Sequence, residues 1–101
     1  MKAIVTAAVL ALGLTAGSAG ASQALAQKYA CMSCHQVDKK VVGPAFGDVS
    51  KKYKGNAKAE ATVVGVIKAG SKGAWGPVPM PPAPQVPEAD AHAIAKWILS
   101  L

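Results

Sequence analysis

The residues best suited to chemistry lie together in one segment, Cys31–His35, which reads Cys-Met-Ser-Cys-His. Two cysteines separated by two residues and followed directly by histidine form the pattern of covalent haem attachment. One turn of helix, about 3.6 residues, places Cys31 and Cys34 on the same side, where each thiol can add to one haem vinyl group. His35 follows at once, so its imidazole can ligate the iron. The segment therefore predicts one covalently attached haem c with His35 on the metal.

Three other uses of the cysteines fit the chain less well. A thioredoxin-like redox pair needs a βαβ context, and the sequence has no strand-period pattern. A structural zinc site usually has four ligands in a tetrahedron. This chain offers only two cysteines and two histidines, and the adjacent pair Cys34 and His35 is poorly suited to that geometry. A plain disulfide suits an oxidising compartment but leaves the histidine unexplained. Haem attachment is therefore the preferred interpretation.

The second axial ligand decides what such a haem can do. Iron held by histidine alone is open for chemistry, whereas iron held by histidine and methionine is closed and suited to electron transfer. Met32 lies between the cysteines and cannot reach the distal side, but Met80 lies within Gly76–Pro82, beside four prolines. Proline fixes φ and removes backbone donors, so we expect a rigid loop without secondary structure that presents Met80 to the iron. Core packing of Met80 and ligation by His92 are the alternatives.

Four helices are expected to position these ligands. The hydrophobic period and helix-forming composition place them at residues 22–30, 45–53, 58–69 and 87–101. Pro44 is suited to start the second of them, and Gly70 is suited to end the third. Residues 71–87 contain all prolines of the chain except Pro44 and are expected to form a long loop. A loop of this length in so small a domain is usually either disordered or functional.

Apolar residues at helical spacing predict the buried face of each helix. In the third helix the expected stripe is Ala59, Val63, Val66, Ile67 and Gly70. In the last helix it is Ala91, Ile94, Ile98 and Leu101, with Trp97 at its margin and His92 on the opposite, polar side. Gly65 interrupts the third helix at a cost of about 1 kcal/mol relative to alanine. It either admits a close neighbour or is a tolerated defect.

The first 21 residues have the pattern of a secretory signal peptide. Lys2 supplies a short positive region, residues 3–14 are apolar and uncharged, and a small-x-small tripeptide ends at Ala21. The apolar run is short for a membrane span, although an uncleaved anchor and a second cleavage site a few residues later stay open. We expect residues 1–21 to be a cleaved leader and residues 22–101 to be one exported domain.

The charge of the chain is basic, and all of the basic residues are lysine. The net charge of the whole chain is +6, and removal of the leader with Lys2 lowers it by one. Such a balance suits nucleic acid, an anionic membrane or an acidic protein. Export and the absence of arginine argue against nucleic acid. We expect a monomer that meets acidic redox partner proteins transiently, with no stable membrane association once the leader is removed.

These features resemble the small bacterial class I cytochromes c of the cytochrome c-551 (cytochrome c8) type. The resemblance covers nearly all of residues 22–101 and rests on four segments: Cys31–His35, Val42–Phe46, Gly70–Pro82 and Ala95–Leu99. It implies an all-α, single-domain cytochrome c fold, with about four helices and a proline-rich loop around one covalently bound haem. It also implies a periplasmic one-electron carrier and not an enzyme.

The family's functional residues map onto this chain individually. The resemblance implies thioether bonds at Cys31 and Cys34, and axial ligation by His35 and Met80. It further implies that the carbonyl of Pro44 accepts a hydrogen bond from the His35 imidazole, which tunes the basicity of that ligand. Trp75 matches a tryptophan whose indole N–H bonds a haem propionate.

The resemblance also predicts a surface for redox partners, and the chain departs from the family at two positions. We call the apolar residues expected around the haem edge, with lysines nearby, the docking patch: Met32, Val41, Pro77, Val78 and Pro81. Many relatives have an asparagine that bonds the methionine sulfur where this chain has Ala83. Relatives often have serine where Pro87 stands, so the last helix is expected to lack a side-chain hydrogen bond at its N-cap.

Two other functions are less consistent with the sequence. A small haem peroxidase or nitrite-handling enzyme would require an open distal site and a positioned acid or base, and Met80 closes that site. A permanent subunit of a larger oxidoreductase would be favoured by a retained leader. In the family, electrons come from membrane cytochrome complexes or copper proteins and pass to a nitrite reductase or a terminal oxidase. The sequence does not choose among these partners.

Overall fold

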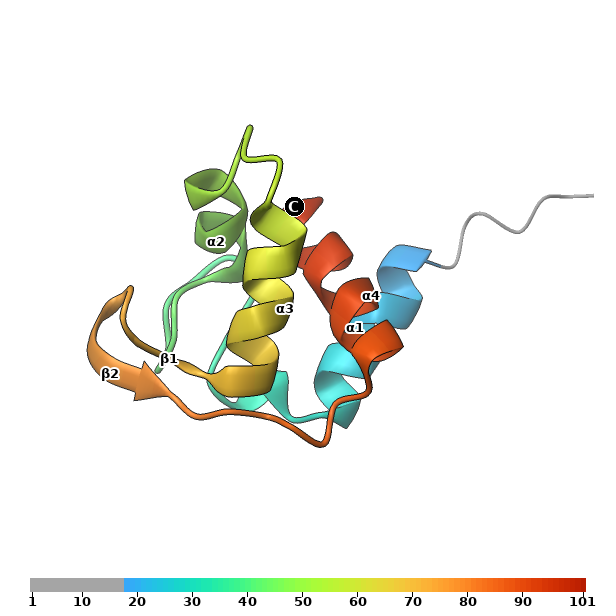
Figure 1. Cartoon of the computed structure of the whole chain (residues 1–101), viewed down its shortest axis with the longest axis horizontal. Coiled ribbons are helices and arrows are strands. Elements are labelled where there is room, and N and C mark those ends of the chain that lie inside the picture. The colour runs from blue at the N-terminus through green and yellow to red at the C-terminus, as the bar shows by residue number, and fades with distance from the viewer. Residues whose placement is uncertain (1–17) are drawn as a thin grey trace, which may run out of the picture.

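The computed structural model describes residues 18–101, so most of the expected leader lies outside the described residues (Figure 1). The helices of this part are α1 (Ser18–Lys28), α2 (Phe46–Lys52), α3 (Ala59–Ala69) and α4 (Glu88–Leu99), with a short 3-10 turn at Cys31–Ser33. Each lies close to its predicted position, and the expected all-α architecture is confirmed. The start of α1 lies before Ala21, and cleavage after that residue stays a prediction. No helix within residues 18–101 has the length and apolarity to cross a membrane.

The helix α4 is the centre of the fold, because α1, α2 and α3 all pack against it (Figure 1). Val86 and Ile94 are the largest side chains that are fully buried. Burying a side chain of this size contributes about 1.5–3 kcal/mol. The core consists of twelve residues from all four helices and the segment before α4: Ala26, Phe46, Val49, Val63, Val64, Ile67, Val86, Ala91, Ile94, Ala95, Trp97 and Ile98.

The buried faces of α3 and α4 differ in part from the predicted stripes. Val64 is buried and Val66 only half-buried, so the face of α3 that packs against α4 differs from the predicted stripe. Trp97 is 6% exposed because Phe46 of α2 covers it in an edge-to-face contact with ring centroids 5.4 Å apart. Leu101 is 44% exposed, because α4 ends at Leu99 and the chain beyond it no longer follows the helical stripe.

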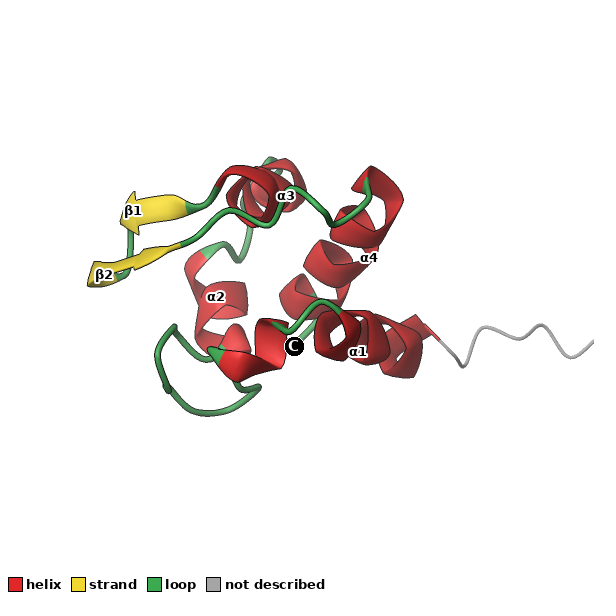
Figure 2. Ribbon diagram, turned by 90° about the horizontal axis from the view of Figure 1, so that it is seen from below, coloured by secondary structure: helices red, strands yellow, loops and turns green. Residues whose placement is uncertain are grey.

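Part of the long loop is a β-hairpin, so the expectation of no secondary structure was wrong there. Strands β1 (Ser71–Gly73) and β2 (Gly76–Met80) pair antiparallel, with Ser71 opposite Met80 and Gly73 opposite Gly76. Gly73 and Gly76 have φ values of 78° and 111°, which glycine adopts readily and which shape the tight turn. Prolines are tolerated because a two-stranded ribbon has only edge strands. Figure 2 shows the hairpin projecting beside α3, away from α1 and α4.

The start of α4 lacks a side-chain cap, as the departure at Pro87 predicted. Pro87 is the N-cap residue, with φ −60° and ψ 151°, and no side chain accepts a hydrogen bond there. Its fixed φ directs the chain into the helix without such a bond. Glu88 and Asp90 lie in the first turn, where negative charge interacts favourably with the helix dipole.

Candidate haem site

The two cysteines lie in a tight turn directly after α1. Ala30 breaks the helix with a left-handed φ of 63°, a conformation that costs a non-glycine residue about 1–2 kcal/mol. In the 3-10 turn that follows, the N–H groups of Cys34 and His35 donate to the carbonyl of Cys31, at 3.2 and 3.1 Å. Both cysteines are half-buried free thiols, and they do not form the disulfide considered as an alternative. Burial raises the pKa of the Cys31 thiol, and a backbone hydrogen bond partly opposes the shift.

The imidazole of His35 is fixed by three neighbours from the following loop and α2. Its Nδ1 lies 2.8 Å from the carbonyl oxygen of Pro44. A carbonyl can only accept, so Nδ1 carries the proton and Nε2 keeps a lone pair for a metal. The ring stacks on Phe46 at a centroid separation of 4.7 Å. Gly43 lies so close that a Cβ there would be 2.5 Å from Cε1 of His35.

The loop between His35 and α2 is held by backbone hydrogen bonds. The N–H of Gly43 donates to the carbonyl of Cys34 at 2.7 Å, and the N–H of Phe46 donates to that of Gln36 at 2.9 Å. The loop therefore returns to the Cys31–His35 turn and brings the Pro44 carbonyl to the imidazole. The partner that the resemblance implied for His35 is present in the structure.

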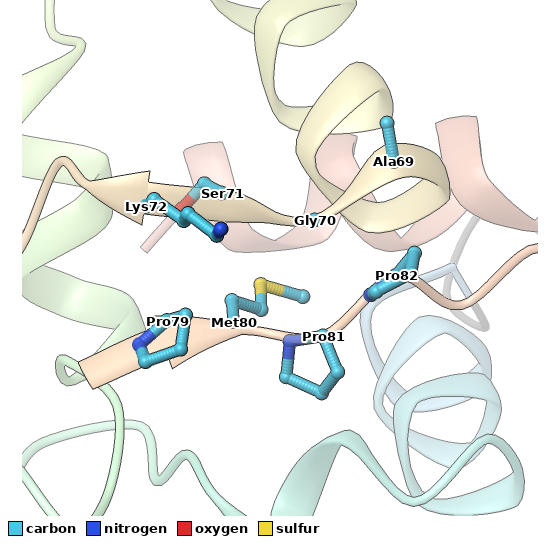
Figure 3. A pocket seen from close by; sticks show the side chains of 8 residues that line it. All are labelled: Ala69, Gly70, Ser71, Lys72, Pro79, Met80, Pro81 and Pro82. Carbon is cyan, nitrogen blue, oxygen red and sulfur yellow. The ribbon is translucent and has the colours of Figure 1, made fainter.

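Met80 is the last residue of β2 and is half-buried. It lines an open pocket of about 450 Å³ beside the end of α3. Figure 3 shows its thioether lying between β2 and the segment around Gly70 and Ser71. The backbones are in close contact here, because a Cβ on Gly70 would lie 2.5 Å from the carbonyl oxygen of Met80 and 2.9 Å from the nitrogen of Pro82. Glycine at position 70 is therefore a condition of Met80's placement.

The chain after Met80 is tied to α3. We call residues 81–87 the strap. The N–H of Ala83 donates to the carbonyl of Ile67 at 2.9 Å, and Nζ of Lys68 donates to the carbonyl of Val86 at 2.6 Å. Val86 itself is fully buried. The strap therefore anchors the C-terminal side of Met80 through the backbone, and the methyl side chain of Ala83 brings no donor of its own.

The structure places the other two candidate residues on different surfaces. Trp75 lies at the tip of the hairpin, is 37% exposed, and has Nζ of Lys52 at 4.5 Å from its ring centroid. His92 lies on the outer face of α4, where Nδ1 is 3.3 Å from Glu60 and Nε2 is 3.5 Å from Glu88. Both nitrogens of His92 thus face carboxylates at the α3–α4 surface.

The donors of this site fit a covalently bound haem. Two free thiols lie one turn apart, and the adjacent histidine is held with Nε2 as its unprotonated nitrogen. Within residues 18–101 no group of three or more His, Cys, Asp or Glu side chains could hold a metal ion, so the zinc interpretation lacks a ligand set there. An all-α domain with these donors defines a c-type haem protein.

Comparison with known proteins places the chain in a family. The sequence profile of the cytochrome c family matches residues 19–101. The chain is 51% identical over 88 residues to cytochrome c-552 of Nitrosomonas europaea, covering 87% of this chain and 85% of that protein. It is 50% identical over 86 residues to cytochrome c-551 of Allochromatium vinosum, covering 85% and 92%. The crystal structure of wild-type Nitrosomonas europaea cytochrome c552 matches with a TM-score of 0.77 at 51% identity, covering 78% of this chain and 98% of that one.

The chain belongs to the class I cytochrome c family and is of the cytochrome c-551/c-552 kind. The predicted haem c, attached through the Cys31–His35 motif, is confirmed by this membership. The protein is a monohaem electron carrier and not an enzyme, as predicted.

Four residues that shape the site were not recognised as such in the sequence. Gly70 carries the signals of a helix end and of a buried stripe, and Gly43 belongs to a Gly-Pro pair, but only the structure shows that both admit a close neighbour. Lys52 and Lys68 donate to carbonyls far away in the sequence, and no sequence pattern assigns either lysine a partner. The Gly-Pro pair at position 43 was a local signal. Lys52 and Lys68 have no such signal in the sequence, because their hydrogen-bond partners are determined by helix packing.

Proposed function

We propose that this protein is a periplasmic carrier of single electrons in which His35 and Met80 are the axial ligands of the haem iron. When bound, haem c supplies the one-electron couple of its iron. The chain's own residues orient the ligands. The observation that carries the proposal is the placement of Met80, held by the contact with Gly70 on one side and by the strap on the other.

The two ligands have complementary supports. Pro44 holds the proton of His35 on Nδ1, which raises the basicity of the imidazole at Nε2. Met80 offers a neutral thioether from a strand whose prolines restrict its backbone. A site closed on both sides in this way admits neither substrate nor oxygen, which suits outer-sphere electron transfer.

The ligation is tested with Met80→Ala, with His92→Ala as the matched control for the alternative second ligand. We expect Met80→Ala to abolish the long-wavelength sulfur-to-iron absorption band of the oxidised protein and to let the reduced protein bind carbon monoxide. His92→Ala should leave both properties as in the wild type. A wild-type protein without the sulfur-to-iron band, or a His92→Ala variant that loses its low-spin spectrum, would contradict the assignment of Met80.

The docking patch supports transient contact with acidic partners. Val41 and Val78 are 47% and 59% exposed. Pro77 and Pro81, which are close to Val78 in the chain, are also exposed, while Met32 is half-buried. A small apolar surface on a basic protein suits weak, electrostatically steered encounters. Reduction by the anionic probe ferrocyanide should therefore slow as salt rises, measured by stopped flow. A rate independent of ionic strength would speak against electrostatic steering.

The periplasmic address rests on the leader and on the family. Most of the leader lies outside the described residues, so a direct measurement is needed. The intact mass of the exported protein, taken with a haemochrome spectrum, reports the cleavage site and the covalent haem together. A mass that retains residues 1–21 would instead favour a membrane-anchored form.

A further inference from the structure

The hairpin lacks the burial that normally fixes a supersecondary element. None of its residues belongs to the core, and all of its side chains except those of Ser71 and Met80 are exposed. An isolated two-stranded hairpin is marginally stable in water at best. Its base is set by the contact between Gly70 and Met80. The resemblance assigns Trp75, at the tip, a bond to a haem propionate, and the described residues provide a second attachment there.

Lys52, the last residue of α2, supplies that attachment. Its Nζ donates to the carbonyl of Ala74 at 3.1 Å and lies 4.5 Å from the ring centroid of Trp75. Among side-chain hydrogen bonds within residues 18–101, it is the one that links the hairpin to another element. The hairpin and α2 lie on the same side of the molecule in both ribbon views (Figures 1 and 2). One ammonium group thus engages both residues of the turn.

We infer that Lys52 is a positioning residue that holds the hairpin tip against α2 and thereby the strand that carries Met80. The two contacts act together, because the carbonyl fixes the position of the ammonium and the aromatic face provides a second, electrostatic attraction. With Gly70 at the base and Lys52 at the tip, both ends of the hairpin are attached. The effect on Met80 rests on the proposed axial ligation, whereas the attachment of Trp75 does not.

The chain provides a matched control for charge. Lys51 is the preceding residue of α2 and is exposed, and its side chain has no hydrogen bond or ion pair in the described part of the chain. Lys51→Gln and Lys52→Gln change the net charge equally, so any general electrostatic effect is common to both. Lys52→Arg keeps a cation that can donate and stack and should restore wild-type behaviour.

The test measures the hairpin and Met80 separately on the haem-containing protein. Hydrogen exchange of the two indole N–H groups, followed by NMR, reports the hairpin through Trp75, and the buried Trp97 serves as internal reference. We expect Lys52→Gln to speed exchange at Trp75 about five- to tenfold, from the combined size of such contacts. Imidazole binding to the oxidised protein, which requires Met80 to leave the iron, should accelerate by a similar factor. Lys51→Gln and Lys52→Arg should change neither rate.

Equal rates in Lys52→Gln and Lys51→Gln would overturn the inference. Faster exchange at Trp75 without faster imidazole binding would overturn the positioning of Met80 by Lys52. The sulfur-to-iron band of the wild type separates this result from the proposed function. If that band is absent, the ligation proposal fails on its own, and the exchange comparison still decides whether Lys52 holds the tip.

Discussion

The contact between Gly43 and His35 makes the sharpest prediction about the haem site. In Gly43→Ala the new methyl carbon would lie 2.5 Å from Cε1, 2.8 Å from Nδ1 and 3.0 Å from Nε2 of the imidazole. Carbon atoms in contact are about 3.5 Å apart or more, so ring or loop must move by about 1 Å. Gly43 is not among the glycines with positive φ, so the conflict is purely steric.

The expected destabilisation has two parts. Overpacking of this kind costs about 1–3 kcal/mol. A displacement of about 1 Å also takes Nδ1 out of hydrogen-bond range of the Pro44 carbonyl, now at 2.8 Å, and loss of that bond costs about 0.5–1.5 kcal/mol. The total of about 2–4 kcal/mol corresponds to a fall in melting temperature of about 10 °C or more for a domain of this size.

The assay is thermal unfolding of the haem-containing protein, with the reduction potential as a second readout. Losing the Nδ1 bond lowers the basicity of the imidazole, which disfavours the oxidised iron, so the potential should rise. Gly65→Ala is the matched control, because a Cβ at Gly65 meets no atom within 4 Å. That change should raise the stability by about 0.5–1 kcal/mol through helix propensity.

The reasoning is refuted if the Gly43→Ala protein has the melting temperature and the reduction potential of the wild type. Such a result would mean that His35 and its loop can accommodate a methyl group without cost. A Gly65→Ala variant destabilised as strongly as Gly43→Ala would also refute it, because the effect would then not come from the imidazole.

Two further predictions concern hydrogen bonds between elements. Lys68→Met removes the 2.6 Å hydrogen bond to the Val86 carbonyl and should lower the free energy of unfolding, measured in urea, by about 1 kcal/mol. Lys72→Met, at an exposed position, should not lower it, and equal effects of the two changes would contradict a stabilising role of the Lys68 bond. Tyr29→Phe removes the 2.7 Å hydrogen bond to Asp90, a bond that raises the pKa of Tyr29 above its ordinary value of 10.0. The wild type should therefore melt at a higher temperature than the variant below pH 10, and it should lose this advantage as the pH rises through the raised pKa. A melting difference that does not change with pH would show that the hydrogen bond is not its source.

The helices were predictable because their signals are local. Hydrophobic period, Pro44 and Gly70 located α2 and α3 closely, and Pro87 marked the start of α4. The hairpin was not predicted, because prolines at alternate positions of β2 indicate a non-strand conformation until the strand is known to have only one neighbour. The signal that could have revealed it was the pair Gly73 and Gly76, which flank a two-residue turn.

The buried faces were only partly predictable, because burial depends on the neighbours as well as on the helix itself. Trp97 belongs to the core since α2 brings Phe46 onto it. Leu101 continues the spacing of the last helix but lies beyond its end and stays exposed. In both cases the burial predicted from the local pattern was wrong, because packing against another element or the end of the helix decided the outcome.

The sequence by itself determined the haem chemistry of this protein, because Cys31–His35 is contiguous and its spacing alone brings two thiols and an imidazole to one site. Only the tertiary structure decided how that chemistry is held. The distance from Lys52 to Trp75 and the bond from Ala83 to Ile67 join residues far apart in the chain. Such contacts follow from the way the helices pack around α4, and no local pattern encodes them.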